Sequence, residues 1–235
     1  MTIYLTELDP QTLSFPSPFE ALEEPNGLLA FGGDLSPERV ELAYQHGIFP
    51  WFGPGEPILW WSPAPRAVFY PKTFAPAKSL KKFQKKQRYS VSINKATAQV
   101  IDYCAGVRPA DETWLNEEMR DTYKRLAKKG RVHSVEVWQD ETLIGGLYGV
   151  SVGQLFCGES MFSLKPNASK VALWYFCRHF ARHDGQLIDC QVINPHLDSL
   201  GAEEIEREDF MQQLLLLKAQ SVKLGCFAQQ ILADE

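Results

Sequence analysis

The sequence predicts an α/β protein whose mixed sheet is covered by helices. Between residues 66 and 130, segments with the two-residue period of strands alternate with segments of helical period. A three-strand meander, a long helix, a buried strand and a last helix follow. With 235 residues, of which 45% are hydrophobic, the chain is long enough for one large domain or two unequal ones. We expect a small proline-rich N-terminal domain over residues 1–64 and a larger domain over residues 65–235.

The N-terminal domain carries one clear helix signal and one unusual loop signal. In SPERVELAYQHG, Ser36 is suited to cap a helix, Pro37 to its first turn and Gly47 to its end. The segment PWFGPGEPILWWSPAPRA (50–67) holds three tryptophans and five prolines. Because proline lacks a backbone donor and pushes the preceding residue toward extended geometry, we expect an ordered but irregular loop there.

The elements of the larger domain follow from periodicity and turn signals. Tight turns at Asp140-Glu141 and near Gly153 join three expected strands into a meander. The expected strands cover 66–70, 89–93, three segments within 133–162, and 186–193. The expected helices cover 77–87, 95–106, 116–130, a segment from Asn167 or Ser169 to about Arg182, and 207–220.

Composition and charge narrow the function classes. The five cysteines are odd in number and widely spaced, which favours free thiols in a reducing compartment, so we expect the cytoplasm. No basic-then-apolar leader is visible, and no apolar run approaches the roughly 18 residues of a membrane span, so membrane insertion is not expected. The net charge of −5 argues against nonspecific nucleic-acid binding by the whole surface.

One segment departs from this acidic balance. Between residues 72 and 88 every charged residue is basic. The basic residues of the expected helix gather on one face, and an arginine follows them: Lys78, Lys81, Lys82, Lys85, Lys86 and Arg88. Like charges at helical spacing repel, so this lysine face is either merely solvated or binds a polyanion. Together with nearby aromatic rings, it suggests RNA.

The tryptophans of segment 50–67 allow two interpretations. Trp51, Trp60 and Trp61 could fill the seam between two domains, because aromatic side chains mostly serve packing. They could also form a stacking platform for a nucleobase.

Acidic residues stand in two otherwise apolar strands. In QLIDCQVI a period of two places Asp189 and Gln191 on one face, so a carboxylate and an amide are expected side by side. Glu159 lies in FCGESMF, at the expected end of another strand. A buried charge is costly unless it is paired, so these groups form either a satisfied structural network or the wall of a site for a cationic group.

An apolar stripe on the long helix combines with apolar residues of the meander. Such stripes belong to the core in most proteins, but this set could also line a hydrophobic pocket that admits several side chains. The candidate lining consists of Leu147, Phe156, Met161, Leu173, Phe176 and Phe180.

Several catalytic and metal motifs are incomplete. GESMF lacks the second glycine of a nucleophile elbow, which argues against a serine hydrolase. His179 and His183 have the i, i+4 spacing of metal ligands, but the glutamate of HExxH is missing and no third ligand is evident. We therefore expect surface histidines near a helix C-terminus and no metal. No GxxxxGK[ST] loop for ATP is present.

Three long strings carry a resemblance to a known family. They are FPSPFEALEEPNGLLAFGGDLSPERVELAYQHGIFPWFGPGEPILWWSPAPRAVFYP, FCGESMFS and LIDCQV. In this order they resemble the leucyl/phenylalanyl-tRNA–protein transferases, from about Phe15 to at least Asp209. The resemblance implies an enzyme that moves leucine or phenylalanine, and less readily methionine, from aminoacyl-tRNA to an N-terminal arginine or lysine, marking that protein for degradation. It also implies an acetyltransferase-like (GNAT-like) larger domain.

The resemblance assigns roles to the candidate residues. Trp51 and Trp114 are expected to border the terminal adenosine, the apolar lining to receive the donor side chain, and the lysine face with Arg88 to hold the acceptor stem. Asp189, Gln191 and Glu159 match positions associated with acceptor binding and catalysis. Since an amide oxygen is a poor base, we expect Gln191 to position the amine or the ester and the two acids to act electrostatically.

No cofactor is expected, and coenzyme A in particular is not. Relatives of the implied fold bind coenzyme A with an [RQ]xxGx[GA] turn at a helix N-terminus. The nearest string here, RHDGQL, lacks the last small residue and lies at a helix end. On the residues alone two other classes stay open: a small-molecule acetyltransferase, and a noncatalytic RNA-binding module whose acids are structural.

Overall fold

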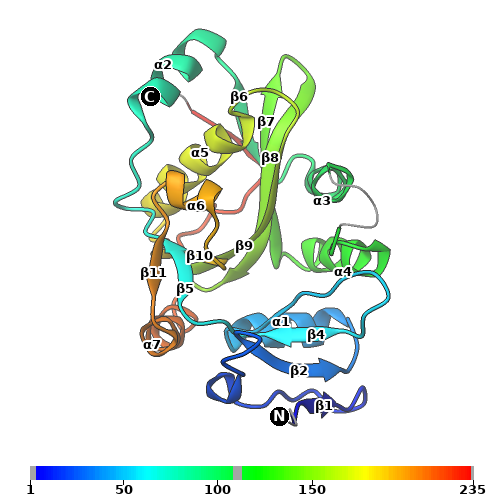
Figure 1. Ribbon diagram of the computed structural model, residues 1–235. Coiled ribbons are helices and arrows are strands. Elements are labelled where there is room, and N and C mark those ends of the chain that lie inside the picture. Colours follow the sequence, from blue (N-terminus) through cyan, green and yellow to red (C-terminus); the bar gives the residue numbers. More distant parts are fainter. Residues whose placement is uncertain (1–3, 108–112, 234–235) are drawn as a thin grey trace.

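Two β-sheets form the framework of the computed structural model, which describes residues 4–107 and 113–233 (Figure 1). The smaller sheet has the strand order β1-β2-β4-β3, and the larger one has the order β11-β5-β10-β9-β8-β7-β6-β12. The strands are β1 (Thr6–Leu8), β2 (Leu28–Gly32), β3 (Phe49–Pro50), β4 (Leu59–Trp61), β5 (Arg66–Phe69), β6 (Ser90–Ile93), β7 (Val132–Gln139), β8 (Thr142–Val152), β9 (Leu155–Ser163), β10 (Leu187–Gln191), β11 (Glu203–Ile205) and β12 (Gln230–Leu232). The helices are η1 (Pro18–Glu20), α1 (Pro37–Gln45), α2 (Lys78–Gln87), α3 (Thr97–Gly106), α4 (Glu117–Lys128), α5 (Ala168–Arg182), α6 (Pro195–Ser199) and α7 (Arg207–Leu217).

The mixed α/β class and the periodic elements after residue 65 are confirmed. Their ends differ by a few residues: the strand expected over 186–193 ends at Gln191, and the helix expected over 207–220 ends at Leu217. The short elements α6, β11 and β12 were not predicted. They span only three to five residues, which is too short for a periodic signal.

The tryptophan-rich segment is irregular over residues 51–58 and 62–65, as its prolines predicted, but short strands interrupt it. Strands β3 and β4 pair antiparallel there, and β4 is an internal strand of the smaller sheet. Pro50 is compatible with this ladder because it lies on the edge strand β3. Trp60 of β4 is fully buried, and its Nε1–H donates to the carbonyl of Gly32 at 3.0 Å. For Trp60, the packing interpretation is correct.

Helices cover both faces of the larger sheet. Helix α5 packs on β7, β8 and β9 from one side, and α3 and α4 pack from the other (Figure 1). The approach of α5 depends on Gly145 of β8, where a Cβ atom would lie 2.4 Å from the Cβ of Ala168. No helix among the described residues has the length and apolar character that crossing a membrane requires.

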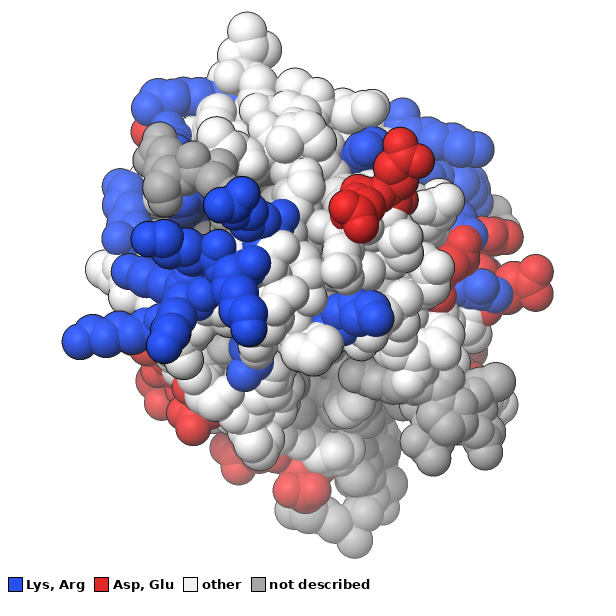
Figure 2. All heavy atoms as spheres, turned by 90° about the horizontal axis from the view of Figure 1, so that it is seen from above, with Lys and Arg blue, Asp and Glu red and all other residues white. Residues whose placement is uncertain are grey.

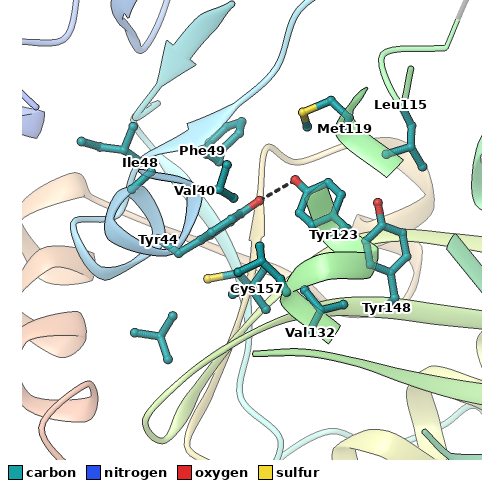
Figure 3. Close-up of a cluster of buried hydrophobic side chains, with 14 of the residues drawn as sticks. Val40, Tyr44, Ile48, Phe49, Leu115, Met119, Tyr123, Val132, Tyr148 and Cys157 are labelled. Carbon is teal, nitrogen blue, oxygen red and sulfur yellow. Dashed lines mark hydrogen bonds between the residues drawn. The ribbon is translucent and has the colours of Figure 1, made fainter. Parts of the chain in front are cut away.

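The smaller sheet is joined to the larger one through a continuous core. Helix α1 packs against α4, and Tyr44 and Tyr123 from these helices belong to one hydrophobic cluster (Figure 3). Hydrophobic burial thus extends across residue 64, where the domain boundary was predicted. This junction places residues of both sheets around one cleft.

Candidate active site

A cleft of about 1140 Å³ opens between the two sheets. One wall comes from the segment around β3 and β4, and the other from β8, β9, α5 and the chain between β10 and α6. Nine of the predicted site residues line it: Trp51, Trp114, Leu147, Phe156, Glu159, Met161, Leu173, Phe176 and Gln191. Segments far apart in the chain therefore meet at one site. Two further candidates, Phe180 and Asp189, lie behind the lining.

The apolar wall is built on stacked phenylalanines. The ring centroids of Phe156 and Phe176 are 4.5 Å apart, and Phe180 stacks on Phe176 at 5.2 Å. Phe180 is fully buried and packs under Gly185, where a Cβ atom would lie 2.3 Å from its ring. The prediction that Phe180 lines the pocket is therefore wrong. Helical periodicity identified its face of the helix, but not where along that face the cleft ends.

The aromatic rim of the cleft is held by a tryptophan pair. Trp51 has an exposed fraction of 47%, which leaves a flat surface open to a ligand. The Nε1–H of Trp61 donates to the carbonyl of Trp51 at 2.6 Å, and their rings lie 5.6 Å apart. Trp61 also lines the cleft. It therefore supports Trp51 in addition to its place in β4, which pairs with β2 and β3. This arrangement fits a stacking surface fixed in advance of binding.

A hydrogen-bond chain reaches Glu159 from the N-terminal helix. The hydroxyls of Tyr44 and Tyr123 point toward each other at 2.8 Å (Figure 3). Tyr123 donates to Oε2 of Glu159 at 2.7 Å, and Nε2 of Gln191 donates to Oε1 at 2.7 Å. Both carboxylate oxygens of Glu159 are thereby fixed in orientation. Sequence reasoning missed the two tyrosines, because no spacing relates residues 44 and 123.

The environment of Glu159 shifts the pKa of its carboxyl group toward neutral pH. Burial raises the pKa of this carboxyl to about 7, although hydrogen bonds from Tyr123, Tyr44 and Gln191 act in the opposite direction. A group with such a pKa can exchange a proton near neutrality, which makes Glu159 a candidate acid or base.

Asp189 and Gln191 do not share a face as predicted. The register of β10 on β5 shifts between them, and Gln191 has a φ of +64°. This bulge breaks the alternation of side chains, so Gln191 faces the cleft together with Cys190. Asp189 turns instead to a buried arginine.

Asp189 forms a bidentate pair with Arg66, and both side chains are essentially fully buried. Nε and Nη2 of Arg66 donate to the two carboxylate oxygens at 2.8 Å each, and Nη1 donates to the carbonyl of Gly47 at 3.0 Å. Oδ1 of Asp189 also accepts the backbone N–H of Gln191 at 2.9 Å. The carboxylate therefore holds the bulge that aims Gln191 at Glu159.

The predicted lysine face is exposed to solvent on α2. The helix buries Leu80 and Gln84 on its opposite side, and the described acidic residues form no ion pair with its lysines. Seen from above, the largest group of lysine and arginine side chains lies on the left of the molecule, and a smaller group lies at the upper right (Figure 2). Such an unbalanced basic surface fits a polyanionic ligand.

Comparisons with known proteins decide the family. Family models of the leucyl/phenylalanyl-tRNA protein transferase and of its N-terminal domain match residues 68–215 and 33–64. A leucyl/phenylalanyl-tRNA–protein transferase of Vibrio cholerae serotype O1 is 70% identical and aligns with 99% of this chain and 96% of its own length. A relative of the same name from Vibrio atlanticus is 67% identical, with coverage of 100% and 99%. The chain belongs to the leucyl/phenylalanyl-tRNA–protein transferase family.

Two solved structures align with part of the transferase at low sequence identity. A conserved protein of unknown function from Bacteroides thetaiotaomicron aligns with a TM-score of 0.43 at 10% identity, covering 64% of this chain and 55% of that chain. L-PGS from Bacillus licheniformis aligns with a TM-score of 0.40 at 13% identity, covering 71% and 54%. The acetyltransferase-like fold therefore stays a prediction.

The family establishes the transferase as an enzyme that moves an aminoacyl group from tRNA to protein. Of the residues that shape its cleft, Arg66 was the one that the sequence could have indicated. It is a charged residue in the otherwise apolar string RAVFY, which is the same signal that singled out Asp189.

Proposed function

We propose that the transferase moves leucine or phenylalanine, and less readily methionine, to the N-terminal arginine or lysine of an acceptor protein, and so marks it for degradation. The observation that carries this proposal is an apolar cleft that ends at the hydrogen-bonded pair of Glu159 and Gln191. The apolar part suits the donor side chain, and the carboxylate suits a cationic acceptor. A hydrophobic pocket separates methylene differences by only about 1–3 kcal/mol, so several large unbranched or γ-branched donors are accepted.

The donor ester is placed along the cleft by two surfaces. The terminal adenosine stacks at Trp51 and Trp114 on the rim, because flat, partly exposed rings bind bases of any sequence. The aminoacyl side chain lies against Phe156, Leu173 and Phe176. With both ends fixed, the ester carbonyl is held near Gln191, which supplies the alignment that the reaction needs.

Bond formation requires a neutral acceptor amine and an activated ester. The amine nitrogen attacks the ester carbonyl, the new C–N bond forms, and the C–O bond to the tRNA ribose breaks. The amine loses one proton and the ribose oxygen gains one. Ionised Glu159 attracts the cationic acceptor and can take up the proton, while the amide of Gln191 positions the reacting groups. The aminoacyl ester is already activated, so this scheme uses no cofactor.

We propose the cytoplasm as the compartment of the reaction. All five cysteines are free thiols, and four of them are buried. Free thiols are typical of reducing compartments, where aminoacyl-tRNA is also made.

The first experiment follows radiolabelled leucine from leucyl-tRNA to a reporter that begins with arginine. A reporter that begins with glycine and a reaction supplied with acetyl-coenzyme A serve as controls. Label on the arginine reporter alone, lost after pretreatment with RNase, supports the proposal. Tight tRNA binding without transfer would favour an RNA-binding module, and acetylation would favour the acetyltransferase.

The lysine face is expected to control the affinity for tRNA. In Lys81→Ala/Lys85→Ala, the slope of log affinity against log salt concentration should become shallower by roughly 0.7–0.9 for each phosphate that the protein no longer neutralises. Filter binding of leucyl-tRNA between low and moderate salt measures this slope. The matched control removes the exposed charges of Arg125 and Lys128 on α4. An equally weakened affinity in both double variants would count against a role for α2.

The apolar wall is expected to set the choice of donor. Leu147→Phe narrows the cleft and should lower transfer of phenylalanine relative to leucine by roughly 10- to 200-fold, which corresponds to about 1–3 kcal/mol. Competition between leucyl-tRNA and phenylalanyl-tRNA in one reaction measures the ratio. Leu143→Phe is the control, because Leu143 is buried on the same strand in the other hydrophobic cluster. A ratio that moves in both variants, or in neither, contradicts the assignment.

A further inference from the structure

Two histidines and a cysteine converge away from the cleft. His179 and His183 are on the last turns of α5 and directly after it, and Cys226 lies in the C-terminal segment that returns to this helix. One potential ligand atom from each residue lies within 4.8 Å of the other two. The sequence offered no third ligand for the histidine pair, because Cys226 is separated from it by more than forty positions. His179 is also buried, contrary to the prediction of surface histidines.

The two imidazole rings are already oriented by the backbone. Nε2 of His179 donates to the carbonyl of Cys226 at 2.7 Å, and Nδ1 of His183 donates to the carbonyl of His179 at 2.8 Å. The other nitrogen of each ring has no hydrogen-bond partner among the described residues. Metal-binding histidines characteristically donate their second ring N–H to a carbonyl or carboxylate, which fixes the tautomer.

The C-terminal segment is anchored to the end of α5 by several further bonds. The backbone N–H of Lys223 donates to the carbonyl of His183 at 2.9 Å. Its Nζ forms an ion pair with Asp184 at 3.0 Å and donates to the carbonyl of Arg182 at 3.3 Å. These three bonds hold Lys223, three residues before Cys226, against the end of α5, so the thiol of Cys226 is presented to the histidines by a preformed scaffold.

We propose that His179, His183 and Cys226 form a site for a single Zn²⁺-class ion. Two imidazole nitrogens and one thiolate are donors that zinc prefers, and a water molecule completes the tetrahedron at the partly exposed His183 side. Binding displaces the thiol proton of Cys226, so one proton is released for each metal ion bound.

The required adjustment is small. With Zn–N near 2.0–2.1 Å and Zn–S near 2.3 Å, the ligand atoms of a tetrahedral site lie roughly 3.3–3.6 Å apart. The present separations are no larger than 4.8 Å, so closure needs a shift of at most about 1 Å, within the range of small side-chain rotations. The ion would tie the C-terminal segment to α5. That segment continues into β12, which pairs with β6 at the edge of the larger sheet.

Metal titration of the full chain without a histidine tag tests the site. The protein is treated with a chelator, desalted and titrated with Zn²⁺ against a chromophoric indicator, and in parallel with Co²⁺. We expect one ion per chain, a thiolate-to-cobalt charge-transfer band, and a higher midpoint of thermal unfolding with zinc. Cys226→Ser should lose the charge-transfer band, and His183→Gln should weaken zinc binding at least tenfold.

The matched control is His46→Gln. The Nδ1 of His46 is bonded to the carbonyl of Leu42, four residues earlier, as in His183, but His46 lies at the end of α1 without neighbouring ligands among the described residues. This variant should bind zinc as the unmodified chain does. Equal weakening in His46→Gln and His183→Gln, or cobalt binding without a thiolate band, would overturn the proposal. Folding of each variant is checked first by its circular dichroism spectrum without metal.

Discussion

Asp189→Asn is expected to lower the free energy of unfolding by about 3–5 kcal/mol, because it leaves the buried guanidinium of Arg66 without its counter-charge. Urea denaturation of the unmodified chain and the variant measures the difference. Turnover with saturating leucyl-tRNA should also fall by about tenfold or more, since the carboxylate anchors the backbone of Gln191 at the bulge. The affinity for tRNA should change much less, because Asp189 lies behind the cleft.

Two further variants separate the structural part of this effect from the functional part. Glu136 is also a fully buried carboxyl, but it is hydrogen-bonded to Ser92, Ser134 and the N–H of Ala96, and burial raises its pKa. Glu136→Gln leaves no buried cation without its counter-charge. We therefore expect the free energy of unfolding to fall by only about 1–2 kcal/mol and turnover to stay normal.

The double variant Arg66→Met/Asp189→Leu removes both buried charges together. An apolar pair of similar volume should restore much of the stability lost in Asp189→Asn, although Gly47 and Gln191 each lose a hydrogen-bond partner. Turnover should stay low, because nothing then fixes Gln191. Recovery of turnover together with stability would show that Asp189 matters only for folding. Equal loss of turnover and tRNA affinity in Asp189→Asn would contradict its positioning role.

The strand QLIDCQVI shows which features of the site sequence periodicity can predict. Its position, its burial and its exceptional polar residues were all predictable, because apolar strands bury side chains and a charge among them demands a partner. The identity of that partner was not predictable, since Arg66 lies 123 positions away. The face of the strand on which Gln191 lies was not predictable either, because a bulge shifts the alternation of side chains without leaving a sequence signal.

The cleft itself shows the same division. Leu173 and Phe176 were placed on one helix face by their spacing, and they do line the cleft, but the same spacing wrongly included Phe180. Local patterns determine which residues are buried and on which side of an element. The tertiary packing of α1 on α4 decides where the cleft closes and which tyrosine reaches Glu159.

Glu159→Gln is expected to lower kcat/KM by about 10²-fold or more and to change the pH dependence of transfer. Below about pH 7 the native enzyme needs both an ionised Glu159 and a neutral acceptor amine, whose ordinary pKa is about 7.7–8.0. A plot of log kcat/KM against pH should therefore approach a slope of two for the native enzyme and one for the variant. Transfer to a peptide that begins with arginine measures these slopes. It is followed from about pH 5.5 to about pH 8.5, which spans both pKa values.

The free energy of unfolding should fall as the pH rises, whereas kcat/KM should rise. The pKa of Glu159 is near 4.5 in the unfolded chain and about 7 in the fold, so between these values the unfolded chain ionises first. Rising pH in this window therefore lowers the unfolding free energy of the native chain by about 3 kcal/mol, and this loss is absent in the glutamine variant. The difference in unfolding free energy between the two should grow in favour of Glu159→Gln from pH 4.5 to pH 7 and then level off.

Tyr123→Phe tests whether the tyrosine chain acts through Glu159. Loss of the Tyr123 hydroxyl removes a donor that favours the ionised carboxylate, so the lower inflection of the pH profile should move to higher pH. A merely structural tyrosine would lower activity at every pH without moving the inflection. Glu136→Gln, which alters a buried carboxyl outside the cleft, should keep the slope and the inflection of the native pH profile. If Glu159→Gln keeps a slope of two, another group supplies the second ionisation and Glu159 is left with acceptor binding alone.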